Sequence, residues 1–154
     1  MNSRSPTSCP GVPLEDLIFV AILKTADALS QQAEQVIKSA GLTMAQYNVL
    51  RILRGAEPEG LLCRGISDRM ISRDPDITRL LDRMENHGWI TRHREKEDRR
   101  VVKTRITEEG LAVLKKLDQP VRELHKGQFS HMSASQLKTL VKLLEEVEKR
   151  EPTE

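Results

Sequence analysis

The sequence predicts a mainly α-helical fold with one small β-hairpin, and three observations support this. Apolar residues recur at helical spacing through most of the 154 residues. After Gly88 the pattern changes to the alternation that is typical of strands. The segment between the two expected strands, residues 95–100, consists of charged side chains alone, which indicates a solvent-exposed hairpin tip.

The first expected element is a long helix over Leu14–Ala40. Gly41 suits the left-handed residue that ends a helix. The apolar stripe of this helix is long for a small domain and predicts an extended partner surface. The preceding residues, Met1–Pro13, carry Ser, Pro, Thr and Gly without the apolar core of a signal peptide, so a disordered tail is expected.

A second helix begins after Thr43 and runs to about Arg54. Thr43 is a good N-cap, and Gln46 three residues later completes a capping box, in which each side chain binds the other residue's backbone N–H. Tyr47, Val49, Leu50 and Leu53 are expected to face the core.

The next segment is less regular. A turn is expected over Gly55–Gly60, followed by a brief strand at Leu61–Cys63. A further helix is predicted over about Arg64–Ile71, because Ile66 and Met70 form an apolar pair at i and i+4.

A short amphipathic helix is then predicted, with Asp74 as its N-cap, Pro75 at the first helical position and Gly88 just past its end. Its apolar stripe consists of Ile77, Leu80, Leu81 and Met84. Its polar side consists of Asp76, Arg79, Asp82, Arg83 and Asn86. By itself this polar side suits a solvated surface with ion pairs such as Arg79 with Asp82.

The hairpin that follows favours a different interpretation. Its strands are expected at Ile90–Arg94 and Val101–Ile106, and the segment from Trp89 to Arg105 holds seven basic and three acidic residues. This excess of positive charge suits a phosphate backbone. A helix that fits a DNA major groove, followed directly by a basic hairpin, is the layout of a winged helix-turn-helix. Residues 42–107 carry fourteen basic and ten acidic side chains, whereas the flanking segments are each net negative.

Two more helical segments are expected at the C-terminal end. Thr107 caps the first, in which Pro120 is expected to cause a kink or a break. Ser133 and Gln136 form a second capping box, followed by an apolar stripe that reaches Val147. These helices and Leu14–Ala40 could pack within one chain, but their apolar stripes exceed what the winged helix can cover, which predicts a two-fold homodimer that shares them.

Chemistry-bearing motifs are few. The sequence has no nucleotide-binding glycine loop, nucleophile elbow or metal-ligand cluster, so we expect no enzyme, no cofactor and no metal. Cys9 and Cys63 are expected to be reduced thiols, with a redox switch as the alternative. No apolar run is long enough to span a membrane, and a cytoplasmic, nucleoid-associated protein is expected.

Four segments together resemble the MarR (multiple antibiotic resistance regulator) family of transcription factors. Asp98–Thr107 resembles the family's wing signature, D-x-R, five residues, then L-T, with Ile106 in place of the Leu. Thr78–Met84 is similar to its T-R-L-[LV]-D-R-L recognition helix, Gly88–Ile90 to its G-[LW]-[IV] exit and Leu42–Tyr47 to its L-T-x-x-Q-[FY] entry.

The resemblance implies a homodimeric winged helix-turn-helix regulator that binds double-stranded DNA at a pseudo-palindromic operator. The expected division is a tail over 1–13, a dimerisation region over 14–41 and 108–150, and a DNA-binding domain over 42–107. Members commonly repress, and a small phenolic or anionic ligand in a cleft between the lobes relieves repression. A hinge is expected near Gly41 and Gly110.

The resemblance also implies roles for individual residues. Residues from Asp74 to Arg83 are expected in a major groove, with Asp98 orienting Arg100 at the wing tip. The expected DNA-binding residues are Arg73, Asp76, Thr78, Arg79, Arg83, Arg92, Arg99 and Arg100, of which Arg73 and Arg92 are assigned to phosphates. The alternatives are a winged helix that binds another protein and a protein that coats DNA without sequence preference; both predict no sequence-specific footprint.

Overall fold

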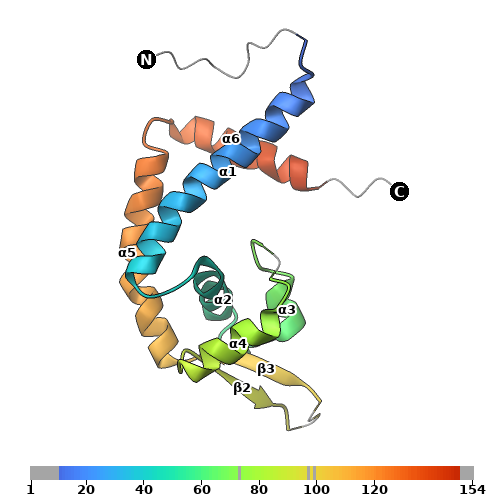
Figure 1. The fold of residues 1–154 in the computed structure, drawn as a ribbon, viewed down its shortest axis with the longest axis vertical. Helices are drawn as coiled ribbons and strands as arrows, with labels where there is room; N and C mark the ends of the chain where they lie inside the picture. Colours follow the sequence, from blue (N-terminus) through green and yellow to red (C-terminus); the bar gives the residue numbers. More distant parts are fainter. Residues whose placement is uncertain (1–10, 73, 97, 99, 150–154) are drawn as a thin grey trace, which may run out of the picture. The chain divides into compact units, whose positions relative to one another are not determined.

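A computed structural model describes residues 11–72, 74–96, 98 and 100–149. The elements are α1 (Leu14–Ser39), α2 (Met44–Arg54), β1 (Leu61–Leu62), α3 (Cys63–Ser67), α4 (Ile77–Asn86), β2 (Ile90–Arg94), β3 (Val102–Ile106), α5 (Glu108–Gln128) and α6 (Ala134–Glu148) (Figure 1). This architecture confirms the predicted mainly α fold with a small hairpin. Residues 1–10 of the expected tail, with Cys9, lie outside the described residues.

The chain forms two compact units, of which the first ends at Val121 and the second begins at Arg122. This boundary lies inside α5 and differs from the predicted division at residues 41/42 and 107/108, which concerns function and stays a prediction. No helix among the described residues combines the length and the apolar character that a membrane crossing requires.

The core of the first unit gathers side chains from α2, α3, α4, the sheet and α5. Residues that are at most 1% exposed include Val49, Leu50, Leu53, Ile66, Leu80, Leu81, Met84, Ile90, Leu114 and Leu117. Full burial of each large apolar side chain stabilises the fold by roughly 1.5–3 kcal/mol relative to exposure. The apolar stripe predicted for the amphipathic helix is therefore what anchors α4.

Local capping fixes α2 and the end of α1. The Thr43 hydroxyl accepts the Gln46 N–H and the Gln46 side chain accepts the Thr43 N–H, which confirms the predicted capping box. Gly41 has a positive φ of 78°, as expected for the residue that ends α1. The second predicted capping box, Ser133 with Gln136, is also present, at the start of α6.

The sheet has the strand order β1-β3-β2, and both pairings are antiparallel. Strands β2 and β3 form the predicted hairpin, with Ile90 opposite Ile106 and Arg94 opposite Val102. The two residues of β1 confirm the expected extra strand, since Leu61 lies opposite Thr104. Strand β2 is therefore at one edge of the sheet, beside α4.

Two helix boundaries differ from the prediction. Helix α3 ends at Ser67 rather than near Ile71, because Asn48 accepts the Ile71 N–H at 2.9 Å and so replaces the helical bond to Ser67. Helix α4 begins at Ile77, two residues later than expected. Asp74 accepts the Asp76 N–H in a turn that contains Pro75, and Asp76 is the N-cap.

Helix α5 continues through Pro120, so the predicted break does not occur, and the alternative of a kink stays a prediction. Leu117 and Val121 on either side of the proline are buried. Because tertiary packing can override helix propensity, burial on both sides of the proline holds the helix together despite the missing N–H.

The end of α4, the base of β2 and the start of α5 share one junction. Gly88 has a positive φ of 79°. Its N–H donates to the Glu85 carbonyl and the Trp89 N–H donates to the Met84 carbonyl, so helix α4 ends in a Schellman motif. The Trp89 carbonyl accepts the Thr107 N–H at 3.0 Å. The Thr107 hydroxyl donates to the Gly88 carbonyl at 2.6 Å and accepts the Gly110 N–H.

Gly110 is the residue that permits this junction; the hinge expected near Gly41 and Gly110 stays a prediction. A Cβ at this position would lie 2.3 Å from the Trp89 carbonyl oxygen and 2.8 Å from an Ile106 side-chain carbon. The backbone of α5 therefore lies directly on the base of the wing, and this packing leaves no space for a side chain.

The first prediction follows from this contact. Gly110→Ala should lower the free energy of unfolding by roughly 1–3 kcal/mol or more, because the added methyl group must displace backbone atoms. Gly127→Ala is the matched control in the same helix, where a Cβ meets no atom within 4 Å. That control should be neutral or stabilising by up to about 1 kcal/mol. Urea unfolding measures both, and equal effects would contradict the close approach.

Candidate nucleic-acid interface

Helix α4 presents one polar face to solvent because its other face is buried. Leu80, Leu81 and Met84 are at most 1% exposed and lie in the core. Thr78, Arg79 and Arg83, three of the predicted DNA-binding residues, are all exposed. Since Arg79 and Arg83 are four residues apart, their guanidinium groups occupy neighbouring positions on that face.

Asp76 organises the first turn of α4. One oxygen of its carboxylate accepts the Arg79 N–H at 3.3 Å, and the other lies 3.1 Å from Nε of the Arg79 guanidinium. The side chain of Arg79 is nevertheless 82% exposed, so the guanidinium is held in position and remains accessible. The ion pair that the sequence suggested, Arg79 with Asp82, does not form; Asp76 is the partner.

Asp82 is instead bound to Arg92 of β2, together with Glu85. The Arg92 guanidinium donates to Asp82 at 2.6 Å, and through Nε to Glu85 at 2.9 Å. A second guanidinium nitrogen also binds Glu85, and the Arg92 backbone N–H donates to the same carboxylate at 3.0 Å. Only 28% of the Arg92 side chain is exposed. The phosphate contact predicted for Arg92 thus loses its support, because the guanidinium already has two carboxylate partners.

The charges of this cluster reinforce one another. Hydrogen bonds from the Arg92 side chain hold the pKa of Glu85 below its ordinary value, because they stabilise the carboxylate form. The same bonds raise the pKa of Arg92. Glu85 is therefore ionised at neutral pH.

The wing tip is shaped by Asp98. Its carboxylate accepts the Arg100 backbone N–H at 2.9 Å, and its carbonyl accepts the Val101 N–H. This bond from the Arg100 main chain to a carboxylate is charge-assisted, the kind of contact predicted between Asp98 and Arg100. The side chain of Arg100 is exposed, whereas Lys103 is paired with Glu95 at 3.3 Å. Arg73 and Arg99 lie outside the described residues.

Sequence reasoning missed two residues of this surface. Arg64, in the first turn of α3, has a side chain that is 92% exposed, with a long 3.8 Å contact to Asp68. Glu85 was not singled out because its partner Arg92 lies seven residues further on, across the turn into β2. The signal for Arg64 was available, since a cation at the start of the first helix of a helix-turn-helix faces the DNA backbone.

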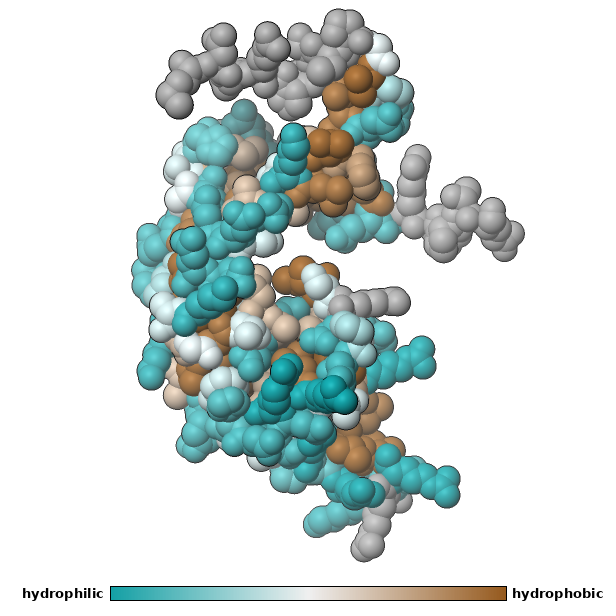
Figure 2. All heavy atoms as spheres, in the orientation of Figure 1, coloured by the Kyte–Doolittle hydropathy of each residue, from teal (hydrophilic) through white to brown (hydrophobic). Residues whose placement is uncertain are grey.

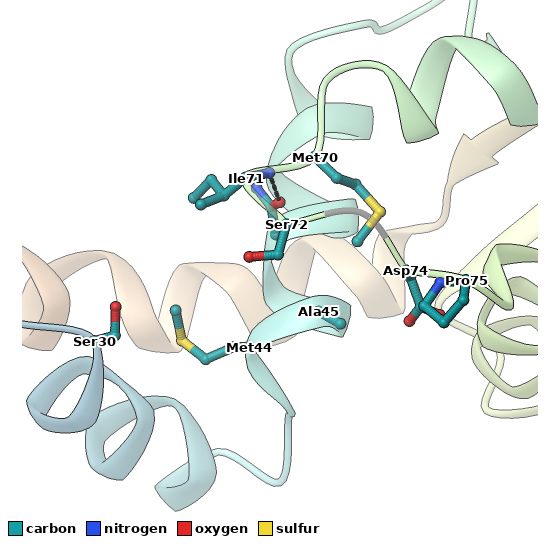
Figure 3. A pocket seen from close by; sticks show the side chains of 9 residues that line it. Ser30, Met44, Ala45, Met70, Ile71, Ser72, Asp74 and Pro75 are labelled. Atoms are coloured by element: carbon teal, nitrogen blue, oxygen red, sulfur yellow. Dashed lines mark hydrogen bonds between the residues drawn. The ribbon is translucent and has the colours of Figure 1, made fainter. Parts of the chain in front are cut away.

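A pocket opens beside the start of α4. Its volume is about 370 Å³, and its lining residues are Ser30, Met44, Ala45, Asn48, Met70, Ile71, Ser72, Asp74 and Pro75. Figure 3 shows Ser30 and Met44 at one end and Asp74 and Pro75 at the other. Asn48 and Ile71, which also line the pocket, are joined by the hydrogen bond from the Ile71 N–H. The pocket therefore joins α1 and α2 to the segment that leads into α4.

Other reactive groups are few in the part of the chain that the structure describes. Cys63 is a half-buried free thiol. No group of three or more His, Cys, Asp or Glu side chains among the described residues could hold a metal ion.

Comparison with known proteins agrees with this geometry. A crystal structure of a MarR transcription factor from Planctomyces limnophilus is 38% identical, with a TM-score of 0.66, and the match covers 87% of this chain and 97% of that one. The transcriptional repressor IacR of Pseudomonas putida is 29% identical over 133 residues, which are 86% of this chain and 78% of the repressor. The crystal structure of an organohalide-sensing transcriptional regulator, RdhR, in its 2,4-dichlorophenol-bound form is 16% identical and shares the fold, with a TM-score of 0.77 over 96% of this chain and 86% of that one. A model of the MarR family matches residues 42–102. With an exposed helix-turn-helix face, a basic wing and these relatives, the chain belongs to the MarR family of transcriptional regulators.

Proposed function

We propose that this regulator is a homodimeric repressor, which binds a pseudo-palindromic operator and is released from it by a small aromatic ligand. The observation that carries the proposal is the exposed polar face of α4, anchored by a buried apolar face and followed directly by a basic hairpin. In winged helix-turn-helix proteins the second helix enters the major groove, and basic side chains outside it reach the minor groove or the backbone.

Among the described residues, the proposed contacts follow from which cations are accessible, whereas Arg73 and Arg99 are proposed from their positions in the sequence. Thr78, Arg79 and Arg83 contact base edges or phosphates in the major groove, and Asp76 orients Arg79. Arg73 and Arg64 contact phosphates, which fix the position of the protein without reading sequence. Arg99 and Arg100 enter the adjacent minor groove, where arginine is favoured by the narrow, negative environment of A-tracts.

The proposed dimer covers apolar surface that one chain leaves open. On α1 these residues are Leu14, Ile18, Phe19, Val20 and Leu23, and on α6 they are Val141, Leu143, Leu144 and Val147. Each is between 41% and 63% exposed, and Figure 2 shows hydrophobic residues gathered over the N-terminal half of α1. Large exposed apolar patches mark interfaces, and a two-fold axis brings identical patches of two subunits together.

The proposed ligand site is the pocket beside α4. Its volume of about 370 Å³ lies in the range of small-molecule sites. Asp74 supplies a carboxylate, and the described lining residues include no cation, so an uncharged phenol is favoured over a carboxylate ligand. A ligand that moves Asp74 also moves the start of α4, because Asp74 holds the Asp76 N–H. RdhR, which has the same fold, is known with 2,4-dichlorophenol bound.

The second prediction tests this ligand class. Uncharged phenols should weaken operator binding more than benzoates of the same size do, because a carboxylate ligand is repelled by Asp74. Asp74→Asn keeps the oxygen that accepts the Asp76 N–H but removes the negative charge. In this variant, phenols and benzoates should differ less in how strongly they weaken operator binding. Glu57→Gln, which removes a carboxylate from the exposed turn after α2, is the control and should leave the difference unchanged. If benzoates act as strongly as phenols on the unmodified protein, the proposed ligand class is wrong.

The third prediction separates the two DNA-reading elements. Arg79→Ala should cost about 1–3 kcal/mol on the best operator and relax preference at one base position in each half-site. Arg100→Ala should weaken binding to many sequences, most at AT-rich flanks, and lower the salt slope by about one unit per subunit. Titration of both variants against a randomised operator library at two salt concentrations measures these effects. An Arg100→Ala protein with unchanged affinity and salt slope would mean that the hairpin is not a DNA wing, and would favour a protein-binding function.

A further inference from the structure

Arg92 joins the two DNA-reading elements of the proposed interface to each other. It lies in the middle of β2, the edge strand that forms one side of the wing. The outward backbone N–H of such a strand has no strand partner. Here the Glu85 carboxylate of α4 accepts this N–H at 3.0 Å, and it binds the Arg92 guanidinium as well. The recognition helix and the wing are therefore tied by both the backbone and the side chain of one residue.

The second carboxylate makes this tie directional. Asp82 and Glu85 are three residues apart on α4 and so lie on the same side of the helix, one turn apart. The Arg92 guanidinium binds both, at 2.6 Å to Asp82 and through Nε at 2.9 Å to Glu85. A planar guanidinium held at two points along the helix resists rotation of α4 about its own axis, as well as its separation from β2.

The charges of this cluster are opposite to those of a phosphate-binding site. One guanidinium faces two carboxylates, so the cluster adds net negative charge beside the surface that is proposed to bind DNA. Because carboxylates already neutralise the Arg92 charge, removing Arg92 should not change the number of counterions that the protein releases when it binds DNA. A negatively charged cluster at this place disfavours DNA by simple electrostatics, so its benefit must lie in geometry.

We propose that Arg92 is a positioning residue for DNA recognition, which acts with Glu85 and Asp82 to fix the angle between the recognition helix and the wing. The inference rests on the proposed function, because the helix and the wing must reach adjacent grooves of the same operator. Removing the tie leaves every proposed DNA contact in place but lets the two elements move relative to each other. The affinity that is lost is then the affinity for the operator, because specific binding needs the recognition helix and the wing at once, whereas the affinity for random DNA changes less.

A double-mutant cycle provides the test, with Glu85→Gln, Arg92→Gln and the double variant. The ratio of affinities for operator and for random DNA is measured at several salt concentrations, at a temperature where circular dichroism shows each variant folded. Each single variant should lower the ratio by about tenfold, and the double variant should lose far less than the product of the two losses. The salt slope of Arg92→Gln should equal that of the unmodified protein.

Glu95→Gln is the matched control. Glu95 has the same side-chain exposure as Glu85, 35%, and pairs with Lys103 within the wing. Removing this carboxylate should raise DNA affinity or leave it unchanged, whereas Glu85→Gln should lower specific affinity although it also removes a negative charge. If Glu85→Gln raises operator affinity as Glu95→Gln does, the positioning role is wrong. Arg92→Gln could instead lower the salt slope by about one unit per subunit and reduce operator affinity by the same factor whether position 85 holds Glu or Gln. In that case Arg92 contacts phosphate and the positioning role is wrong. An unmodified protein that does not prefer the operator to random DNA would overturn the proposed function itself, and the positioning role with it.

Discussion

The close approach of α5 to the Trp89 carbonyl is the constraint on which the DNA-reading unit depends. Gly110 allows it because a Cβ would lie 2.3 Å from that oxygen. The same carbonyl accepts the Thr107 N–H, and the Thr107 hydroxyl binds the carbonyl of Gly88. Three elements therefore start or end at one set of backbone atoms: the recognition helix, the wing and α5.

The positive charge of residues 42–107 is divided between two tasks. Arg92 and Lys103 are occupied by carboxylates of the same unit, whereas Arg64, Arg79 and Arg100 present exposed side chains. Arg79 belongs to both groups, because Asp76 orients it and yet leaves it 82% exposed. Among the described residues, the salt dependence of the proposed interface should be set by these exposed cations rather than by the total charge. The acidic residues Asp76, Asp82 and Glu85 repel DNA by their charge, but they hold the guanidinium groups of Arg79 and Arg92 in place.

Local sequence chemistry predicted much of the fold. The capping boxes at Thr43 and Ser133, the left-handed glycines at the ends of α1 and α4 and the alternation of β3 each depend on residues a few positions apart. The failures have non-local or competing causes. Asp74 and Asp76 both suit an N-cap, and only the turn that contains Pro75 decides between them. The end of α3 depends on Asn48, which is twenty-three residues away from Ile71. The partners of Arg92 depend on how β2 lies against α4, which no local pattern contains.

Chemical footprinting of the protein on its preferred DNA tests the central claim most directly, namely that a dimer reads two half-sites with α4 and flanks them with the wing. Methylation interference at guanine N7 should mark two major-groove segments about one helical turn, or about 10 base pairs, apart. Hydroxyl-radical protection should add minor-groove protection on the outer side of each segment, and Arg100→Ala should remove that outer protection alone. A single protected segment, or uniform protection without periodicity, would contradict the account.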